Sequence, residues 1–251
     1  MVRALVTGGA RGVGAAVAVA LAEAGMTVAV HARADVAAAE AVVAKLPGDG
    51  HVVVSGDIGD PEQVRALVAD AVSGLGGLDV LVNNAAIYTE LPIAASSYEE
   101  WIADWRRIVD VNLLGTANVT WCFVEHVRTR PEGPGGARIV NVGSRGAYRG
   151  EPDAPAYGAS KAGLHSLTQS LAVSLAPLGI VVTAVAPGFV ATDMTESVLS
   201  GERGDAIRAQ SPFGRVGEPE DVASAVAWLA SPGALWASGA VLDVNGASYL
   251  R

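Results

Sequence analysis

The chain has 251 residues, 51% of them hydrophobic, which is enough apolar material for one large α/β domain. Its formal net charge is −9, from 17 basic and 26 acidic side chains without a basic run, and this argues against nucleic acid or an anionic membrane as a partner. The single cysteine excludes an intrachain disulfide, and the four histidines lie at no metal-binding spacing, so we expect no metal site.

The N-terminal residues carry no targeting pattern. The first apolar run, Ala4 to Thr7, leads straight into glycines and lacks the hydrophobic stretch and cleavage pattern of a signal peptide. No segment is long and apolar enough to span a bilayer. A lone cysteine fits a reducing compartment, so we expect a soluble, cytoplasmic protein.

Short runs rich in β-branched residues alternate with helix-length segments along the whole chain. Most runs are continuously apolar, as in strands buried on both faces of a parallel sheet, and the segments between them are long enough for right-handed crossovers. The predicted strands are Ala4–Thr7, Thr27–His31, His51–Ser55, Val80–Asn83, Arg138–Val142, Ile180–Ala186 and Ala240–Val244. The sequence therefore predicts a single-domain Rossmann α/β fold over residues 1–251, a doubly wound, seven-stranded parallel sheet with helices on both faces.

The first predicted strand runs into a glycine-rich turn, TGGARGVG at residues 7–14, followed by a helix predicted over Ala15–Ala24. Glycines at positions 8, 12 and 14 permit a tight turn and a close backbone approach, and a helix N-terminus offers unpaired N–H groups to a phosphate. The spacing is Gly-x3-Gly-x-Gly, which differs from the commoner Gly-x-Gly-x2-Gly. The strand-to-helix setting predicts a pyrophosphate site and hence a dinucleotide cofactor.

The end of the second predicted strand bears on which dinucleotide binds. Folds that select NAD usually place an acidic residue there for the ribose hydroxyls, whereas this strand ends His31-Ala32-Arg33. Arg33, together with Arg11 in the glycine turn, suits a 2′-phosphate, because guanidinium groups hold phosphates through charge-assisted bidentate bonds. NADP(H) is therefore favoured over NAD(H). Two alternatives stay open: both arginines are solvated loop residues, or Asp35 serves NAD(H).

Polar residues follow the third and fourth predicted strands. Asp57 comes after the third strand, and Asn83-Asn84-Ala85-Ala86 ends the fourth. Open α/β sheets bind ligands at the carboxyl ends of their strands, which favours contacts with the cofactor. The alternative is structural, with Asp57 capping a helix after Pro61 and the asparagines shaping a turn. In the helix predicted over Ser97–Val127, Asn112 is an isolated polar residue in an apolar stretch.

A helix predicted over Tyr157–Leu178, with leucines every three or four residues, carries the candidate catalytic pair. Tyr157 and Lys161 are four residues apart and share a face, and a nearby ammonium brings a tyrosine toward the pKa at which proton transfer is useful. Ser144, after the fifth predicted strand, is suited to hydrogen-bond a carbonyl oxygen beside that tyrosine. No Gly-x-Ser-x-Gly elbow surrounds Ser144, which argues against a hydrolase nucleophile.

Six motifs follow one another along the chain: TGGARGVG at 7–14, NNAA at 83–86, Asn112, Ser144, Tyr157-x3-Lys161 and Pro187-Gly188. With them the chain resembles the short-chain dehydrogenase/reductase family over essentially its full length. The resemblance is strongest toward 3-oxoacyl-acyl-carrier-protein reductases and related ketoreductases, through APGFVATDM at 186–194 and the C-terminal stretch that begins GRVGEPEDVA at 214. One departure is Ala86, where the family usually has glycine; the added methyl group is expected to tighten the cofactor cleft.

The resemblance implies a role for each matched residue. Tyr157 would be the general acid in reduction or the base in oxidation, and Lys161 would lower its pKa and hold the nicotinamide ribose. Ser144 would orient and polarise the substrate carbonyl, and Asn112 would anchor a water that replaces the proton. The expected cofactor contacts are Gly8, Arg11, Gly12, Val13 and Gly14 at the phosphates, Asp57 and Ile58 at the adenine, Asn84, Ala85 and Ala86 on the adenosine side, and Pro187, Gly188, Val190 and Thr192 at the nicotinamide.

The expected function is NADPH-dependent reduction of a ketone, a 3-oxoacyl thioester or a related small carbonyl compound, to a secondary alcohol. The alternatives are an NAD-dependent secondary alcohol or sugar dehydrogenase and a non-catalytic dinucleotide-binding sensor or scaffold. Residues 192–210 are expected to form a mobile lid, with Arg145, Tyr148, Arg149 and Glu151 flanking the pocket. The two long helices resemble those that pair subunits in the family, which implies a homotetramer or a homodimer.

Overall fold

The computed structural model of the chain describes residues 2–251. All seven predicted strands are present, and each end lies within one residue of its predicted position. The strands are β1 (Arg3–Val6), β2 (Thr27–Ala32), β3 (Val52–Ser55), β4 (Val80–Asn83), β5 (Arg138–Val142), β6 (Val181–Pro187) and β7 (Val241–Val244). The predicted fold class is therefore confirmed.

The strands form one parallel sheet in the order β3-β2-β1-β4-β5-β6-β7. Leu5 of β1 pairs with Ala29 of β2 on one side and with Leu81 of β4 on the other. The chain winds outward in one direction from β1 to β3 and in the other from β4 to β7. The strand order thus reverses between β1 and β4, and it is outside the carboxyl ends of strands at such a point that doubly wound sheets bind ligands.

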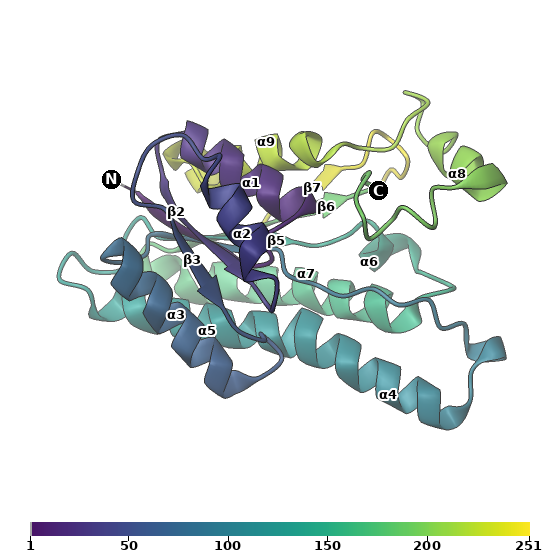
Figure 1. Ribbon diagram of the computed structural model, residues 1–251, viewed down its shortest axis with the longest axis horizontal. Helices are drawn as coiled ribbons and strands as arrows, with labels where there is room; N and C mark the ends of the chain where they lie inside the picture. The colour runs from purple at the N-terminus through teal and green to yellow at the C-terminus, as the bar shows by residue number, and fades with distance from the viewer. Residues whose placement is uncertain (1) are drawn as a thin grey trace.

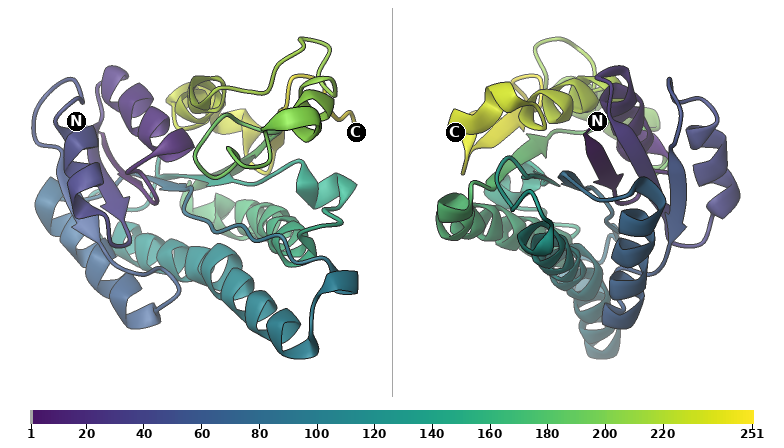
Figure 2. Two further views of the ribbon diagram at one scale, coloured as in Figure 1. Left: turned by 45° about the vertical axis from the view of Figure 1, so that its right-hand side comes forward. Right: turned by 90° about the vertical axis from the view of Figure 1, so that its left-hand side faces the viewer.

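Helices cover both faces of the sheet (Figures 1 and 2). The upper face in Figure 1 carries α1 (Gly12–Glu23), α2 (Val36–Val43) and α9 (Pro219–Leu229). The lower face carries α3 (Pro61–Leu75), α5 (Thr116–Thr129) and α7 (Pro155–Leu175). Because neighbouring residues of a strand point to opposite faces, Val6 packs into the upper core with Val17 and Leu5 into the lower core with Phe123.

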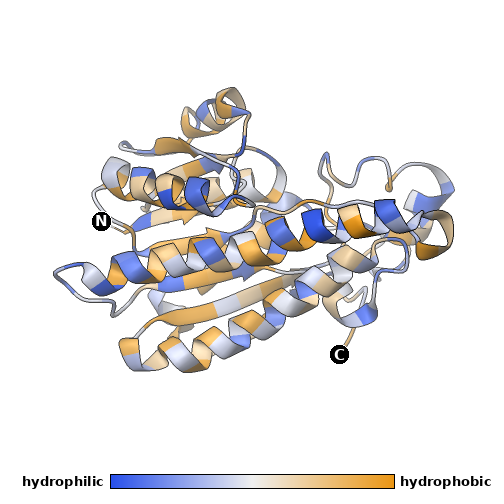
Figure 3. Ribbon diagram, turned by 90° about the horizontal axis from the view of Figure 1, so that it is seen from below, coloured by the Kyte–Doolittle hydropathy of each residue, from blue (hydrophilic) through white to orange (hydrophobic). Residues whose placement is uncertain are grey.

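The long helix predicted over Ser97–Val127 is divided in the structure. It consists of α4 (Tyr98–Val109), a π-helical segment at Asp110–Gly115, and α5. A Cβ on Gly115 would overlap the carbonyl oxygen of Ile58, so only glycine lets the helix pass this close to the loop after β3. Seen from below, α3, the α4–α5 helix and α7 run side by side across the sheet, with apolar and polar segments alternating along them (Figure 3).

Two short helices lie toward the carboxyl end of the sheet. The short helix α6 (Gly146–Arg149) follows β5, and α8 (Gly201–Arg208) follows β6 (Figure 1). Helix α7 begins two residues earlier than predicted, at Pro155, whose fixed φ suits the first helical turn, and a 3₁₀ turn at Ala176–Leu178 completes the predicted span. Within residues 2–251, no helix is long and apolar enough to cross a membrane.

Candidate active site

The glycine turn between β1 and α1 has the geometry that its sequence predicts. Gly8 and Gly12 adopt positive φ angles of 63° and 53°, which side chains rarely tolerate. A Cβ on Gly14 would overlap the carbonyl oxygen of Gly8, so the third glycine is required by the close approach of helix and turn. Helix α1 begins at Gly12, three residues before the predicted start, and its first N–H groups therefore lie within the turn.

Two sets of side-chain hydrogen bonds hold the glycine turn in place. Asn84 donates from its side-chain nitrogen to the carbonyl oxygens of Thr7 and Gly8, at 3.0 Å each. The Thr7 hydroxyl accepts in return from the backbone N–H groups of Asn84, at 3.0 Å, and Ala85, at 3.1 Å. The predicted NNAA motif therefore acts on the glycine turn through the backbone, across the reversal point of the sheet.

The second set of hydrogen bonds involves His31, for which no role was predicted. Its Nδ1 accepts from the Gly8 N–H at 3.0 Å, and its Nε2 lies 2.8 Å from the Gly56 carbonyl oxygen. Burial lowers the pKa of His31, which keeps the ring neutral, as an accepting Nδ1 requires. A histidine at the end of an otherwise apolar strand is the only sequence signal for this role.

These elements border a cleft of about 360 Å³ at the reversal point. Of the predicted cofactor residues, it is lined by Gly8, Arg11, Gly12, Val13, Gly14, Arg33, Asp57, Ile58, Asn84, Ala85, Ala86 and Thr192. It is also lined by Asp193 and Met194, which belong to the predicted lid segment but were not predicted as cofactor contacts, and by Val111 of the π-helical segment, for which no role was predicted. Gly12 and Thr192 approach each other across the cleft, because a Cβ on Gly12 would lie 3.2 Å from the Thr192 methyl group.

Three predicted nicotinamide residues lie elsewhere. Gly188 lines a smaller neighbouring pocket, and the carbonyl oxygen of Pro187 accepts from the backbone N–H of Arg145 at 2.9 Å. Val190 forms an isolated parallel bridge with Gly217. All three lie at or beyond the end of β6.

Charged side chains of the cleft have different surroundings. Arg11 and Arg33 are both exposed. Asp35 accepts from the backbone N–H of Ala38 at 3.0 Å and thereby caps α2. Asp57 accepts from the N–H of Gly59 at 2.9 Å, while the cap of α3 is Asp60, so the alternative prediction of Asp57 as the cap of that helix is wrong.

The candidate catalytic residues lie close together, where β5 ends and α7 begins. Ser144 and Tyr157 line the same small pocket, and Ser144 hydrogen-bonds the Tyr157 side chain. The Lys161 ammonium lies 5.7 Å from the centre of the Tyr157 ring and donates to the Val142 carbonyl oxygen at 2.8 Å. The predicted residues on two separate elements are thus brought together.

Burial dominates the electrostatics of this group. Desolvation raises the pKa of Tyr157 to about 12; the hydrogen bond with Ser144 lowers it, and the negative charge of Glu151 raises it further. Desolvation also lowers the pKa of Lys161 to about 8. We expected the pKa of Tyr157 to be lowered by Lys161. In the structure its pKa is raised instead, since sequence spacing predicts the neighbouring charge but not the depth of burial.

Asn112 lies in the π-helical segment and is almost fully buried. Its Oδ1 accepts from the N–H of Ile87, and its Nδ2 donates to the carbonyl oxygen of Ile87, both at 2.9 Å. Nδ2 also lies 3.2 Å from the Ser160 hydroxyl, which itself donates to the Tyr157 carbonyl oxygen at 2.7 Å. Asn112 therefore joins the loop after β4 to the first turn of α7. Ser160, which was not predicted, completes this link.

A second pocket, of about 70 Å³, adjoins the cleft, and we call it the small pocket. Its lining residues are Tyr88, Ser144, Arg145, Glu151, Tyr157, Gly188, Phe189, Met194, Thr195 and Val198. Tyr88 packs edge-on against Tyr157, with ring centres 5.1 Å apart, and donates to Glu90 at 3.0 Å. Glu90 pairs with Arg203 of α8 at 2.8 Å.

Another residue without a predicted role, His165, lies behind Ser144. Its Nε2 is 3.4 Å from the Ser144 backbone nitrogen, and a Cβ on Gly143 would overlap it. Burial and the positive charge of Lys161 lower its pKa to about 4, which leaves Nε2 free to accept. It is four residues after Lys161, and this helical spacing is the only signal that would have drawn attention to it.

Comparisons with known proteins show the family to which the chain belongs. A protein-family model described as Enoyl-(Acyl carrier protein) reductase matches residues 8–247. The 3-oxoacyl-[acyl-carrier-protein] reductase of Staphylococcus aureus strain Mu50 is 38% identical over 249 residues, which cover 98% of each chain. The chain belongs to the short-chain dehydrogenase/reductase family. As a member of this family it is an NAD(P)-dependent oxidoreductase.

Solved structures of this family superpose closely on the chain. A short-chain dehydrogenase from Burkholderia cenocepacia J2315 in complex with NADP has a TM-score of 0.86 at 36% identity, covering 98% of this chain and 97% of that one. A 3-ketoacyl-(acyl-carrier-protein) reductase from Brucella melitensis complexed with NADH has a TM-score of 0.87 at 35% identity, covering 99% and 98%. The similarity extends over the whole chain and therefore includes both pockets.

Proposed function

We propose that the protein reduces a ketone to a secondary alcohol with NADPH, and that Tyr157 is the general acid. The observation that carries this proposal is the Ser144–Tyr157 pair in the small pocket next to the cleft. With a pKa of about 12, the phenol is protonated at neutral pH. A protonated phenol is a proton donor, so it suits reduction better than oxidation.

The residues of the cleft fit a dinucleotide. Gly8, Gly12 and Gly14 carry no side chain where the turn and the N-terminus of α1 line the cleft, which suits a pyrophosphate. Asp57 and Ile58 line the part of the cleft suited to the adenine, and Ala85 and Ala86 the part suited to the adenosine. The related Burkholderia and Brucella structures, which contain NADP and NADH, support this assignment.

A nicotinamide held at the cleft beside the small pocket would supply the hydride for the carbonyl carbon. Ser144 donates a hydrogen bond to the carbonyl oxygen and stabilises the developing negative charge, and Tyr157 transfers its proton to that oxygen. Lys161 places a positive charge beside the phenolate that is left. Asn112 fixes the first turn of α7 through Ser160 and so holds Tyr157 in position. Residues 192–210 act as the lid that excludes water from this step.

NADPH is favoured by the charges around the outer end of the cleft. Arg11 and Arg33 are the exposed basic residues that line it, and both are suited to a 2′-phosphate. Asp35 lines the same cleft, and this residue favours the second candidate, an NAD-dependent alcohol or sugar dehydrogenase. Its carboxylate is already engaged in capping α2, which weakens that alternative.

The substrate class is a carbonyl compound, either a small molecule or an acyl thioester. The Staphylococcus relative is a reductase of 3-oxoacyl groups carried on acyl carrier protein, which supports a 3-oxoacyl group here. The description of the family model names an enoyl reductase, an enzyme that reduces a C=C bond instead of a ketone. Ser144 and Tyr157 favour the ketone, because two hydroxyl donors that share one pocket match the single oxygen of a carbonyl group.

A homodimer or homotetramer is the expected assembly. Helices α5 and α7 lie side by side on the lower face of the sheet and expose apolar side chains, with Trp121 62% and Val173 78% exposed. Exposed apolar side chains on adjacent helices suit a contact with a second copy of the chain.

The proposed function is tested by Tyr157→Phe. The variant keeps the ring and its packing against Tyr88 but loses the proton donor, so reduction of ketones should fall by about 10² to 10⁴-fold. NADPH binding, followed by nucleotide fluorescence, should be nearly unchanged. If Tyr157→Phe reduces ketones at the rate of the unchanged protein, the proposal is wrong.

A further inference from the structure

The carboxylate of Glu151 is the unusual group of the small pocket. It lines the pocket together with Ser144 and Tyr157, and its charge raises the pKa of Tyr157, so it lies close to the phenol. Its side chain also packs against the backbone at Gly146 and Gly158, where a Cβ would contact it. Glu151 is therefore held between α6 and the first turn of α7, beside the proposed reaction centre.

No side-chain or backbone donor among residues 2–251 hydrogen-bonds or pairs with this carboxylate. Glu151 lines the pocket, and its oxygens are not among the fully enclosed polar atoms that lack a partner. Burial raises the pKa of Glu151, as expected for an acid that has exchanged water for a partly apolar site. A half-buried carboxylate without a partner is costly, and a hydrogen-bond donor on a ligand would remove that cost.

The neighbouring guanidinium groups are directed elsewhere. Arg145 donates to Gln210 at 2.6 Å and to the Ser248 hydroxyl at 2.5 Å, and Arg149 donates to Gln210 at 3.1 Å. Both positive charges act on Glu151 from a distance and lower its pKa, against the larger effect of burial, and neither guanidinium group occupies its carboxylate. They also disfavour a cationic substrate. A neutral hydroxyl group is therefore the donor that this arrangement suits best.

We propose that Glu151 determines specificity by binding a hydroxyl group of the substrate while the carbonyl oxygen meets Ser144 and Tyr157. The preferred substrates are then hydroxyketones, and this assignment rests on the proposed ketone reduction. Phe189, Met194 and Val198 form an apolar part of the pocket wall, which suits the carbon skeleton of the substrate. A 3-oxoacyl chain without a hydroxyl group leaves Glu151 unpaired and binds less well.

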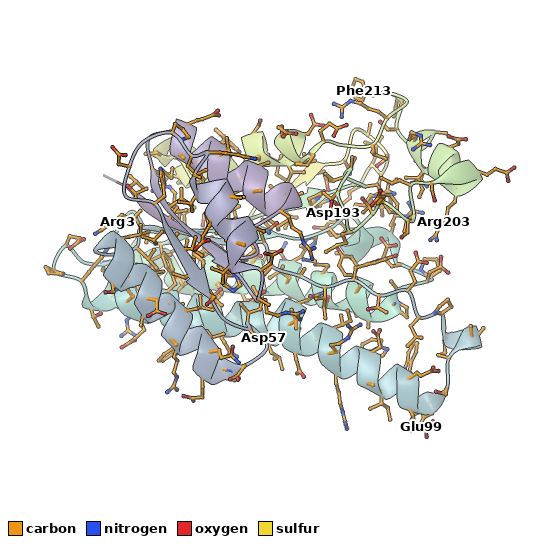
Figure 4. All side chains as sticks on the ribbon, viewed as in Figure 1. Arg3, Asp57, Glu99, Asp193, Arg203 and Phe213 are labelled. Carbon is orange, nitrogen blue, oxygen red and sulfur yellow. The ribbon has the colours of Figure 1, made fainter. Side chains whose placement is uncertain are left out.

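The test compares ketones that differ by one hydroxyl group. Hydroxyacetone is matched with 2-butanone, and 4-hydroxy-2-butanone with 2-pentanone, because a hydroxyl and a methyl group have similar size. The kcat/KM ratio within each pair is measured for the unchanged protein, for Glu151→Gln and for Glu151→Leu. The matched control is Glu99→Gln, which removes an exposed carboxylate at the outer end of α4, far from α8 (Figure 4). Thermal melting checks that each variant is folded.

We expect the ratio to fall at least about tenfold in Glu151→Leu for one or both pairs, because a hydrogen bond to a charged group is lost. Glu151→Gln should be intermediate, since an amide oxygen still accepts, and Glu99→Gln should leave both ratios unchanged. Intrinsic reactivity of the hydroxyketones cancels, because each ratio is compared between proteins. Equal ratios in Glu151→Leu and the unchanged protein would overturn the role of Glu151.

A binding measurement separates this inference from the proposed function. The affinities of 1,2-propanediol and 2-butanol for the NADP⁺ complex are compared by calorimetry, which needs no turnover. Tighter binding of the diol that disappears in Glu151→Leu supports the role of Glu151 even if no ketone is reduced. If ketones are reduced but the diol has no Glu151-dependent advantage and the kcat/KM ratios are equal, the proposed function stands and this inference is wrong.

Discussion

The two pockets at the carboxyl end of the sheet are held together by different forces. The cleft between β1 and β4 is shaped by backbone geometry, with glycines at positive φ and neutral hydrogen bonds that Asn84 donates to the turn and His31 accepts from it. The small pocket after β5 is lined by two half-buried ionisable groups, Tyr157 and Glu151, and the buried Lys161 lies beside Tyr157; desolvation shifts the pKa of all three. The cleft is therefore defined by the geometry of its backbone, whereas the small pocket contains groups that can exchange a proton.

This difference decides what each pocket tolerates. A backbone-defined cleft is sensitive to added volume and insensitive to pH, because its donors do not titrate near neutrality. A pocket of buried ionisable groups is sensitive to pH and to loss of charge, and it lowers the stability of the fold. Substitutions on the two sides should therefore give opposite effects on binding, turnover and stability.

The largest effect on the cleft is expected from Gly14→Ala. The new Cβ overlaps the carbonyl oxygen of Gly8, so the turn must shift and the affinity for NADPH should fall by at least about tenfold, or roughly 1.4 kcal/mol. Fluorescence titration with NADPH measures the change. Gly135→Ala is the control, because a Cβ there meets no atom within 4 Å. Equal affinities in the two variants would contradict the description of the cleft as defined by backbone geometry.

On the other side, Lys161→Met should abolish turnover and yet stabilise the fold. Because the pKa of Lys161 falls from 10.5 to about 8 on folding, the unfolded chain binds the extra proton between these values, and stability decreases as the pH falls from about 10.5 to 8. Below pH 8 the burial of the Lys161 charge destabilises the folded chain by its full amount. At pH 7 the free energy of unfolding of Lys161→Met should therefore be roughly 3 kcal/mol higher than that of the unchanged protein, less the contribution of the lost hydrogen bond to Val142.

Denaturant unfolding of the unliganded protein at pH 7 and pH 10 measures this gain. The difference in stability between variant and unchanged protein should shrink at pH 10, where Lys161 is neutral in the folded chain and its release of a proton on folding costs little, because the pH is close to the pKa of 10.5 in the unfolded chain. Comparing the two proteins at each pH cancels the titration of all other groups. A Lys161→Met protein that is less stable at pH 7 would show that the ammonium stabilises the fold, and the contrast between the two pockets would be lost.

The sequence predicts the cleft better than the small pocket, for the same physical reason. Strand ends and the glycine turn depend on local features, the apolar runs and the glycines themselves, so their positions follow from a few adjacent residues. The direction of the pKa shift of Tyr157 was predicted wrongly because burial is set by the whole fold. Glu151 has no hydrogen-bond partner because the nearby Arg145 donates to Gln210 and Ser248 instead, and these two acceptors lie far away in sequence.

The π-helical segment could not be predicted from its sequence either. Asp110–Gly115 has the same apolar periodicity as the helical residues on each side, and no proline interrupts it. Its wider turn follows from two tertiary contacts, the side chain of Asn112 on the loop at Ile87 and the approach of Gly115 to Ile58. Asn112 was recognised as an exception to the apolar pattern, and its contacts became known only from the fold.

A smaller effect is expected at the outer end of the cleft. Arg33→Ala should weaken NADPH binding about tenfold and leave NADH binding nearly unchanged, because only the 2′-phosphate needs the guanidinium. Paired fluorescence titrations with the two nucleotides measure this, with Arg106→Ala on α4 as the control. This result would show that a charged side chain contributes to nucleotide binding in the cleft at Arg33. Tighter NADH binding that Arg33→Ala leaves unchanged would favour Asp35 and the NAD-dependent alternative.

The smallest effect is expected where the lid meets the small pocket. Arg203 of α8 pairs with Glu90 at 2.8 Å and Asp153 at 3.4 Å, and Glu90 accepts from Tyr88, which packs on Tyr157. Because the Arg203 side chain is about half exposed, its pairing contributes only about 0.2–1 kcal/mol. Arg203→Ala should therefore raise KM for a ketone about two- to fivefold with little change in kcat.

The salt dependence of KM shows whether this pairing closes the lid. In the unchanged protein KM should rise with added salt toward the value of Arg203→Ala, whereas the variant should respond little, since an exposed pair is screened. Arg208→Ala is the control, because Arg208 pairs with Asp205 inside α8 and does not reach the loop after β4. An Arg203→Ala protein with unchanged KM would mean that the lid closes by apolar contacts of Met194 and Val198 alone, and that charge governs only the proton-transfer centre of the small pocket.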